Sequence, residues 1–266
     1  MGKGRIITLL TDFGTEDSYV GAMKGVVFSI NPNATIIDIS HQIPPQDIMA
    51  GAFVLSHAAP FFPQDTIHVA VVDPGVGGER KPILVETERY FFVGPDNGIF
   101  SIALKGEKIK KRIILSNKEY FYDRGERPFA PTFHGRDIFS PVAAYLSLGI
   151  EPSLFGEKIK AVKSLDFKKP YVRIGKIIGQ IIHIDRFGNL ITNIDEGLLK
   201  RIFKNKSFEI RIGSCIIKKL VPSYTHAKQG ESIGLIGSSG FLEIAMREKN
   251  ASAEMGIKRG DRAEVR

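Results

Sequence analysis

The stretch TIHVAVVDPGVGGERK, residues 66–81, contains the features that decide the fold of this chain. Its apolar run is rich in β-branched residues and does not alternate with polar ones, which predicts a strand buried on both faces of a sheet. Asp73 ends the run, and the proline and glycines after it force a turn and let the backbone approach a ligand or adopt a positive φ. The loop is therefore either an ordinary turn or a binding site, and without a G-K-[ST] ending it is not a P-loop.

Segments on both sides of this strand alternate between the hydrophobic patterns of strands and of helices. Strands are predicted at residues 5–11, 35–40 and 66–74, with helices between them at residues 17–32 and 47–62. This β-α-β-α-β order predicts an α/β domain with a mostly parallel sheet and helices on both faces. Further along the chain, residues 82–96 indicate two strands, and residues 97–104 and 135–149 indicate two helices.

The pattern changes near residue 155, where lysines become frequent and apolar periodicity is lost. Beyond this point short apolar runs are separated by glycines, with a single predicted helix at residues 196–203. Regularly spaced short strands are typical of a small barrel or sandwich. We therefore predict an α/β domain over residues 1–160, a linker over residues 161–172 and a small all-β, barrel-like domain over residues 173–266.

Composition excludes several classes of protein. With 266 residues, 43% of them hydrophobic, the chain is able to bury a core, and one cysteine excludes a disulfide framework or a thiolate metal cluster. No leader or long apolar segment is apparent, so we expect a soluble, cytoplasmic protein. The net charge of +8 permits a nucleic-acid-binding face, but the lysines are scattered and nucleic-acid-binding motifs are absent, which favours a solvated basic surface.

Three polar residues follow predicted strands or precede a predicted helix. Asp12 and Asp73 come after the first and third strands, at the edge where open α/β sheets bind ligands, although an aspartate beside glycine or proline also forms ordinary Asx-turns. His134 precedes the predicted helix at residues 135–149, and its position alone is equally compatible with a structural role. The six histidines lack the spacings of a metal site, so we expect none.

Six short motifs occur in one order along the chain. They are TDFG (11–14), VDPGVG (72–77) with an arginine soon after, FVGPDNG (92–98), FHGRD (133–137), DRFGN (185–189), and GSSGFLEIA (237–245) with Asn250 and Ala251 beyond. In this order they resemble the S-adenosyl-L-methionine (SAM) hydrolases, also called SAM hydroxide adenosyltransferases, which are relatives of fluorinase and chlorinase. The resemblance extends from Ile6 to Ala251 and so covers both predicted domains.

The resemblance implies a metal-free reaction without a cofactor, in which water or hydroxide attacks the ribose C5′ of SAM and releases adenosine and L-methionine. It implies that Asp73, Arg80 and His134 are catalytic, with either Asp73 or His134 accepting the proton. Because the chain carries this triad and lacks the extra loop of the halogenating relatives, hydroxide is favoured over halide as the nucleophile. A halide-dependent 5′-halo-adenosine synthase and a non-catalytic nucleoside or nucleic-acid binder remain the alternatives.

The resemblance also implies the substrate contacts. Those assigned are Asp12 to the ribose hydroxyls, Asn189 and the backbone of Ala251 to adenine, Asp185 to the methionine ammonium, and Ser238 and Ser239 to the carboxylate. Ser239 stands where the halogenases carry arginine, and one residue fewer separates Asp185 from the FGN sequence than in those enzymes. Similar proteins are homotrimers that bind substrate between the first domain of one subunit and the second domain of its neighbour. We expect the same assembly here, with SAM as the partner and neither nucleic acid nor membrane involved.

Overall fold

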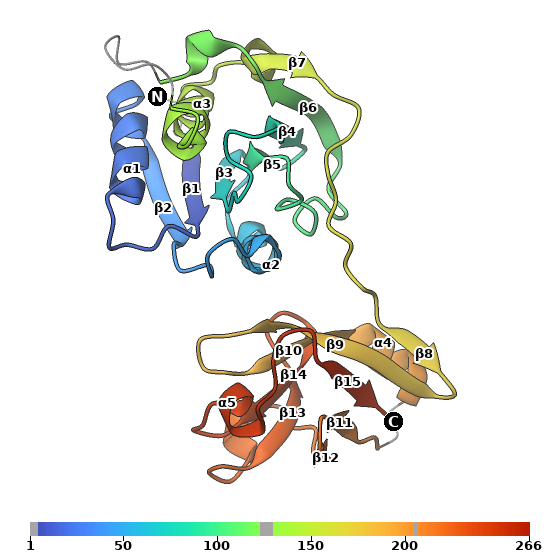
Figure 1. Cartoon of the computed structure of the whole chain (residues 1–266). Helices are drawn as coiled ribbons and strands as arrows, with labels where there is room; N and C mark the ends of the chain where they lie inside the picture. The colour runs from blue at the N-terminus through green and yellow to red at the C-terminus, as the bar shows by residue number, and fades with distance from the viewer. Residues whose placement is uncertain (1–4, 123–129, 205–206) are drawn as a thin grey trace. The chain divides into compact units, whose positions relative to one another are not determined.

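The computed structural model of the chain describes residues 5–122, 130–204 and 207–266. They form two compact units, Met1–Asp166 and Phe167–Arg266, and the division lies within the predicted linker (Figure 1). None of the helices in the described part of the chain combines the length and apolar character that a membrane crossing requires.

The first unit is built on a seven-stranded sheet in the order β2-β1-β3-β5-β4-β6-β7. The strands are β1 (Ile6–Thr11), β2 (Thr35–Ser40), β3 (Thr66–Val71), β4 (Pro82–Thr87), β5 (Tyr90–Pro95), β6 (Ile109–Leu115) and β7 (Gly156–Lys158). The helices are α1 (Tyr19–Ile30), α2 (Ile48–Ala58) and α3 (Ser140–Ser147), with a π-helical turn, η3 (Gly135–Phe139), directly before α3. Three short 3₁₀ turns complete the unit: η1 (Ala59–Phe61), η2 (Lys118–Tyr120) and η4 (Pro152–Phe155).

Helices cover both faces of this sheet, as the alternation along its central strands requires. Ile67 and Val69 of β3 belong to the apolar core formed with α1 and α3, whereas Ala70 belongs to the core formed with α2. All six residues of β3 are buried, which confirms the prediction of a strand covered on both faces.

The sheet is mixed, so the prediction of a mostly parallel sheet was only partly correct. Strands β2, β1, β3 and β5 pair in parallel, whereas β4, β6 and β7 join through antiparallel pairs. The physical reason is the short connection between β4 and β5, since a parallel pair needs a long crossover.

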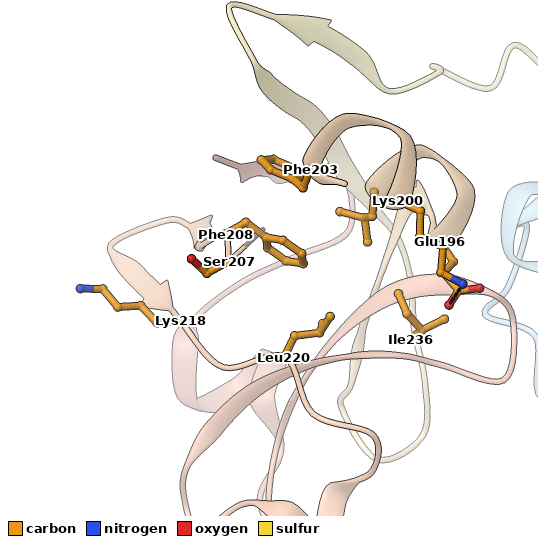
Figure 2. A pocket seen from close by; sticks show the side chains of 9 residues that line it. Glu196, Lys200, Phe203, Ser207, Phe208, Lys218, Leu220 and Ile236 are labelled. Atoms are coloured by element: carbon orange, nitrogen blue, oxygen red, sulfur yellow. Dashed lines mark ion pairs between the residues drawn. The ribbon is translucent and has the colours of Figure 1, made fainter. Parts of the chain in front are cut away.

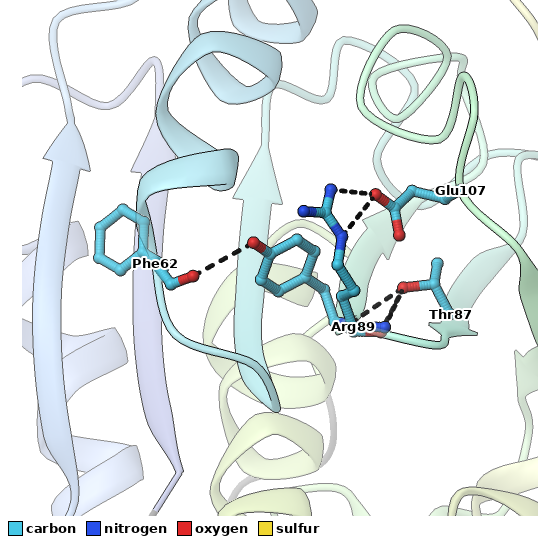
Figure 3. A network of polar contacts seen from close by, with 5 residues as sticks. Phe62, Thr87, Arg89 and Glu107 are labelled. Atoms are coloured by element: carbon cyan, nitrogen blue, oxygen red, sulfur yellow. Dashed lines mark hydrogen bonds and ion pairs between the residues drawn. The ribbon is translucent and has the colours of Figure 1, made fainter.

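Side-chain hydrogen bonds hold the turn between β4 and β5. The hydroxyl of Thr87 accepts the N–H groups of Arg89 and Tyr90, and the Tyr90 hydroxyl donates to the Phe62 carbonyl (Figure 3).

The helix predicted at residues 97–104 is a series of turns. Ser101 and Lys105 donate to carbonyls three residues earlier, and only Leu104 makes the α-helical bond to a carbonyl four residues earlier. Gly98 and Gly106, at φ 99° and 87°, bound the segment in conformations that do not continue a helix.

The second unit is a nearly closed, barrel-like antiparallel sheet in the order β12-β11-β15-β9-β10-β14-β13, with β8 paired to β9. The strands are β8 (Tyr171–Arg173), β9 (Lys176–Ile184), β10 (Leu190–Asp195), β11 (Ile210–Ile212), β12 (Cys215–Ile217), β13 (Ser232–Ile236), β14 (Phe241–Met246) and β15 (Arg262–Val265). A bridge between Leu220 and Gly234 joins the segment after β12 to β13. Two helices, α4 (Glu196–Phe203) and α5 (Ala251–Met255), and the 3₁₀ turn η5 (Tyr224–His226) accompany the strands. Only α4 was predicted.

Candidate functional site

Asp73 and Arg80 form a two-pronged ion pair at the start and end of the glycine loop. Arg80 Nε donates to Asp73 Oδ1 at 2.9 Å, and Arg80 Nη2 donates to Oδ2. Their side chains are 6% and 4% exposed for arginine and aspartate respectively. A planar fork matched to a carboxylate is the geometry in which arginine binds most strongly. The loop is therefore more than a connection between strands: it returns the chain so that its two ends meet.

His134 joins this pair from a distant part of the sequence. Its Nδ1 lies 2.6 Å from Arg80 Nη2. Because guanidinium is only ever a donor, Nδ1 must accept this bond, and a neutral ring then carries its hydrogen on Nε2. Burial lowers the pKa of His134 below its ordinary value, and the Arg80 charge lowers it further, while Asp73 and Asp137 oppose the shift. The imidazole is thus kept neutral at physiological pH.

A glycine-dependent contact brings these segments together. Gly77 has φ 75°, and a Cβ atom there would lie 2.6 Å from the Pro131 carbonyl oxygen. The loop therefore packs directly against the segment that leads into His134. His134 itself precedes the π-helical turn η3, in which Ser140 N–H bonds the Gly135 carbonyl five residues earlier. Such π-helical turns are rare and often occur at functional sites.

The third guanidinium nitrogen of Arg80 indicates where a ligand binds in the cluster. Nη1 is buried and has no hydrogen-bond partner within the part of the chain that the structure describes. An unpaired buried donor costs on the order of 1–3 kcal/mol, more when it is charged, so such donors are rare unless a ligand uses them. The Arg80 side chain is thus arranged to hold Asp73, His134 and one further acceptor.

Asp12 lies at the same edge of the sheet as Asp73. Thr11 pairs with Val71 across the parallel strands β1 and β3, so both strands end at one level. The Asp12 carboxylate accepts the backbone N–H of Gln46 at 2.7 Å through Oδ2. The placement predicted for both aspartates at the carboxyl edge is therefore confirmed, although the described contacts of Asp12 are not with the cluster of Asp73, Arg80 and His134.

One buried residue of the FHGRD sequence was missed by the sequence analysis. Asp137 is 2% exposed and accepts Arg136 Nε at 2.6 Å, Arg136 Nη2 at 2.9 Å and the backbone N–H of Ala130 at 3.0 Å. It thereby holds the chain on the N-terminal side of His134. The aspartate that ends this sequence was the available signal, but only the fold shows that it is buried.

In the second unit Asp185 organises its own turn. Its Oδ1 accepts the backbone N–H groups of Phe187 and Asn189, both at 2.9 Å, and its Oδ2 accepts the Asn189 side-chain amide at 2.9 Å. A carboxylate has about four acceptor positions. Three are used here, which leaves one on Oδ2.

The turn of Asp185 lies beside the start of α5. Ser252 N–H donates to the Gly188 carbonyl at 2.9 Å, and a Cβ atom on Gly188 would lie 2.1 Å from Asn250 Oδ1. Ala251, the first residue of α5, is fully buried. The structure therefore brings Asp185, Asn189 and Ala251 to one place.

Ser238 and Ser239 occupy the turn between β13 and β14. The turn is closed by the Gly240 N–H, which donates to the Gly237 carbonyl at 2.9 Å. Beside it Glu243 is 6% exposed, and the Tyr224 hydroxyl donates to its Oε1 at 2.6 Å. Burial raises the pKa of Glu243, and the charge of Asp185 raises it further, against the lowering effect of the Tyr224 bond.

Other features of the described residues do not extend these sites. Within residues 5–122, 130–204 and 207–266 no group of histidines, cysteines and carboxylates is arranged to hold a metal. A cavity of about 510 Å³ lies between α4 and the segments that precede β11 and follow β12, lined among others by Phe203, Phe208 and Leu220 (Figure 2). None of the site residues predicted from the sequence lines it.

Comparison with known proteins matches both units to one family. The model of the SAM hydroxide adenosyltransferase N-terminal domain matches residues 7–156, and that of the C-terminal domain matches residues 179–264. A protein from Methanocaldococcus jannaschii named (R)-S-adenosyl-L-methionine hydrolase is 42% identical, with 98% of this chain and 95% of that protein covered. A Thermus thermophilus protein of the same name is 32% identical over 96% of this chain and 97% of its own length.

A more distant relative and a solved structure are also similar to this chain over nearly its whole length. A fluorinase from an Actinoplanes strain is 25% identical, with 96% of this chain and 95% of that enzyme covered. The crystal structure of a conserved protein from Thermotoga maritima is 36% identical and superimposes with a TM-score of 0.90, covering 98% of this chain and 99% of that one.

Proposed function

The chain belongs to the SAM hydroxide adenosyltransferase family, and from this premise we propose how it hydrolyses SAM to adenosine and L-methionine. The observation that carries the mechanism is the buried Asp73–Arg80–His134 cluster with its unpaired Arg80 Nη1. We assign these three residues to catalysis and Arg80 Nη1 to the oxygen of the attacking water.

Arg80 acts electrostatically. A guanidinium does not lose its proton in proteins, so Arg80 is not the base. Its Nη1 donates to the water oxygen, where negative charge develops as the proton leaves, while the other two nitrogens hold Asp73 and His134 in place. A pre-oriented charged donor in a buried site is worth far more than the same donor in water.

We assign the proton to Asp73. The His134 lone pair on Nδ1 is directed at Arg80, and Nε2 carries hydrogen in the tautomer that this contact requires. The new bond joins the water oxygen to C5′, the C5′–S bond breaks, and its electron pair stays on sulfur to form the thioether of methionine. One water proton remains on the adenosine hydroxyl, and the other passes to Asp73 and then to solvent.

Substrate binding is proposed along the lines of the family. Asp12 binds the ribose hydroxyls, Asn189 and the Ala251 backbone bind adenine, and Asp185 binds the methionine ammonium. The single unused acceptor position of Asp185 Oδ2 supports the last assignment. Ser238 and Ser239 receive the carboxylate in the turn before β14. We further propose a homotrimer in which each SAM is bound by two neighbouring subunits.

The experiment that tests this function is incubation with SAM in ¹⁸O-labelled water, with and without chloride, followed by chromatography and mass spectrometry. We expect adenosine labelled at O5′ plus methionine under both conditions. Unlabelled adenosine would overturn attack at carbon. Accumulation of 5′-chloroadenosine would identify a halide-dependent synthase, and intact SAM would identify a non-catalytic binder.

The configuration at sulfur is a finer proposal. The relatives from Methanocaldococcus and Thermus are named for the R form of the substrate, and we assign the same preference to this chain. Measuring kcat/KM separately for the two sulfonium epimers of SAM tests it. A ratio of one, or a preference for the S epimer, would contradict it.

The proposed reaction uses neither a metal nor a cofactor, since the guanidinium and the carboxylate supply the charge that it requires. We expect kcat to be unchanged after dialysis against EDTA. Loss of activity that one particular divalent cation restores would refute this part of the proposal.

A further inference from the structure

We propose that His41 is a positioning residue that fixes the orientation of the Asp12 carboxylate. His41 follows β2 and is 6% exposed, and the mechanism above gives it no role. The inference rests on the proposed ribose-binding function of Asp12.

The His41 side chain contacts the residue before Asp12. Its Nδ1 lies 2.8 Å from Thr11 Oγ1, and the same hydroxyl accepts the Phe13 backbone N–H at 3.3 Å. The hydroxyl oxygen receives that N–H, and its own hydrogen is free to point at Nδ1, so in the tautomer with hydrogen on Nε2 the imidazole accepts from Thr11. The far nitrogen, Nε2, lies 3.1 Å from Asp38 Oδ1, and Asp38 is paired with Lys24 at 2.6 Å. The contact with Thr11 therefore holds one side of the ring, while Nε2 is buried near Asp38 without a hydrogen bond to any residue that the structure describes.

Two backbone contacts from the same segment complete the arrangement. The His41 carbonyl accepts the Gly14 N–H at 2.8 Å, so His41 contacts the turn on both sides of Asp12. Five residues later the Gln46 N–H donates to Asp12 Oδ2. Gln46 has φ 65°, a left-handed conformation that is unfavourable for a non-glycine residue and persists where surrounding contacts enforce it.

These contacts leave a defined part of the Asp12 carboxylate for the substrate. Oδ2 is turned toward Gln46, while Oδ1 has no hydrogen bond from any residue that the structure describes. A ribose diol needs an acceptor whose direction is set before binding, because a freely rotating carboxylate loses entropy on capture. Residues His41 to Gln46 provide that direction.

The chain contains a matched control. His68 is fully buried on β3, and its Nδ1 makes the same 2.8 Å contact with the hydroxyl of Thr8, a residue of the strand that precedes Asp12. Each of the substitutions His41→Leu and His68→Leu removes one hydrogen bond between a histidine and a threonine hydroxyl of β1. Only His41→Leu should disturb Asp12.

The test measures binding of adenosine and of 2′,3′-dideoxyadenosine to the full-length chain by calorimetry, so it does not depend on turnover. Wild type should prefer adenosine, and His41→Leu should lose about tenfold or more of that preference, the effect of a misdirected charged hydrogen bond. His68→Leu should keep the preference, and His41→Asn, which restores an acceptor to Thr11, should recover part of it.

If His41→Leu does not fold, the same comparison of nucleoside preference is made with Thr11→Val, and Thr8→Val serves as its control. Equal weakening for both nucleosides in the His41 and Thr11 variants would reduce His41 to a structural residue. A wild type without preference would remove the ribose function of Asp12 and the inference with it. A wild type that shows the preference but leaves SAM intact would refute the proposed hydrolysis alone.

Discussion

Arg80 combines three contacts that a different cation would not reproduce. Its guanidinium binds Asp73 through two nitrogens, and Nη2 also contacts His134. The guanidinium Cζ lies over the Phe139 ring, 5.6 Å from the ring centroid. Arg80→Lys keeps the charge but replaces the planar fork by a single ammonium. We expect kcat to fall about 10²-fold or more, with the KM for SAM nearly unchanged.

Steady-state kinetics on SAM check this prediction. If KM rises steeply while kcat is retained, Arg80 is a substrate ligand, and the water must be held elsewhere.

His68 predicts how stability depends on pH. Burial lowers its pKa from 6.5 to about 3, so the folded state keeps it neutral while the unfolded state binds a proton below pH 6.5. Between about pH 6.5 and 3 the unfolded chain therefore holds more protons, and the free energy of unfolding falls by up to ~1.4 kcal/mol per pH unit on this account. Above pH 6.5 the contribution is fully present.

Urea unfolding of wild type and His68→Gln from pH 7 to pH 4 isolates this effect, because all other titrating groups are shared. The wild-type curve should be the steeper of the two. Parallel curves would show that His68 is protonated within the fold.

The loop between β3 and β4 positions the cluster of Asp73, Arg80 and His134 through its contact with the segment before His134. Gly77→Ala introduces a Cβ atom that would lie 2.6 Å from the Pro131 carbonyl oxygen, at a residue with φ 75°. Either the loop or the segment before His134 must move. We expect a loss of kcat of roughly tenfold or more together with lower stability, since small displacements of catalytic groups cost rate steeply.

Gly106→Ala is the matched control, because Gly106 has φ 87° and no atom within 4 Å of the added Cβ. It should lose stability from the backbone conformation alone and keep kcat. Equal kcat in the two variants would show that the contact between Gly77 and Pro131 does not position the cluster.

For the whole molecule, the proposed catalytic and adenine-binding residues belong to different compact units. In the proposed trimer, sites combine the first unit of one chain with the second unit of the next. His134→Ala and Asn189→Ala chains, each inactive alone, should then restore activity when unfolded together and refolded. Random assortment gives an intact site in roughly a quarter of positions.

Activity of the mixture relative to wild type, with mixed oligomers verified by mass, checks this arrangement. A mixture as inactive as its parents would place each complete site within one chain.

The predictions that succeeded from sequence depend on local pattern. The unbroken apolar run before Asp73 predicts a central buried strand, and the glycines after it predict a sharp return, since periodicity and turn chemistry act over a few residues. The six ordered motifs identified the family, which the comparisons confirm. The hairpin that makes the sheet mixed was visible as two adjacent strands, but their pairing partners were not.

Contacts between distant segments required the folded chain. His134 meets Arg80 across 54 positions, and Gln46 meets Asp12 across 34. No local periodicity encodes such pairs, because they depend on which strands lie side by side and where each one ends. The neutral state of His134, the unpaired nitrogen of Arg80 and the left-handed Gln46 are all consequences of burial and of backbone direction, which exist only once the sheet and its loops have assembled.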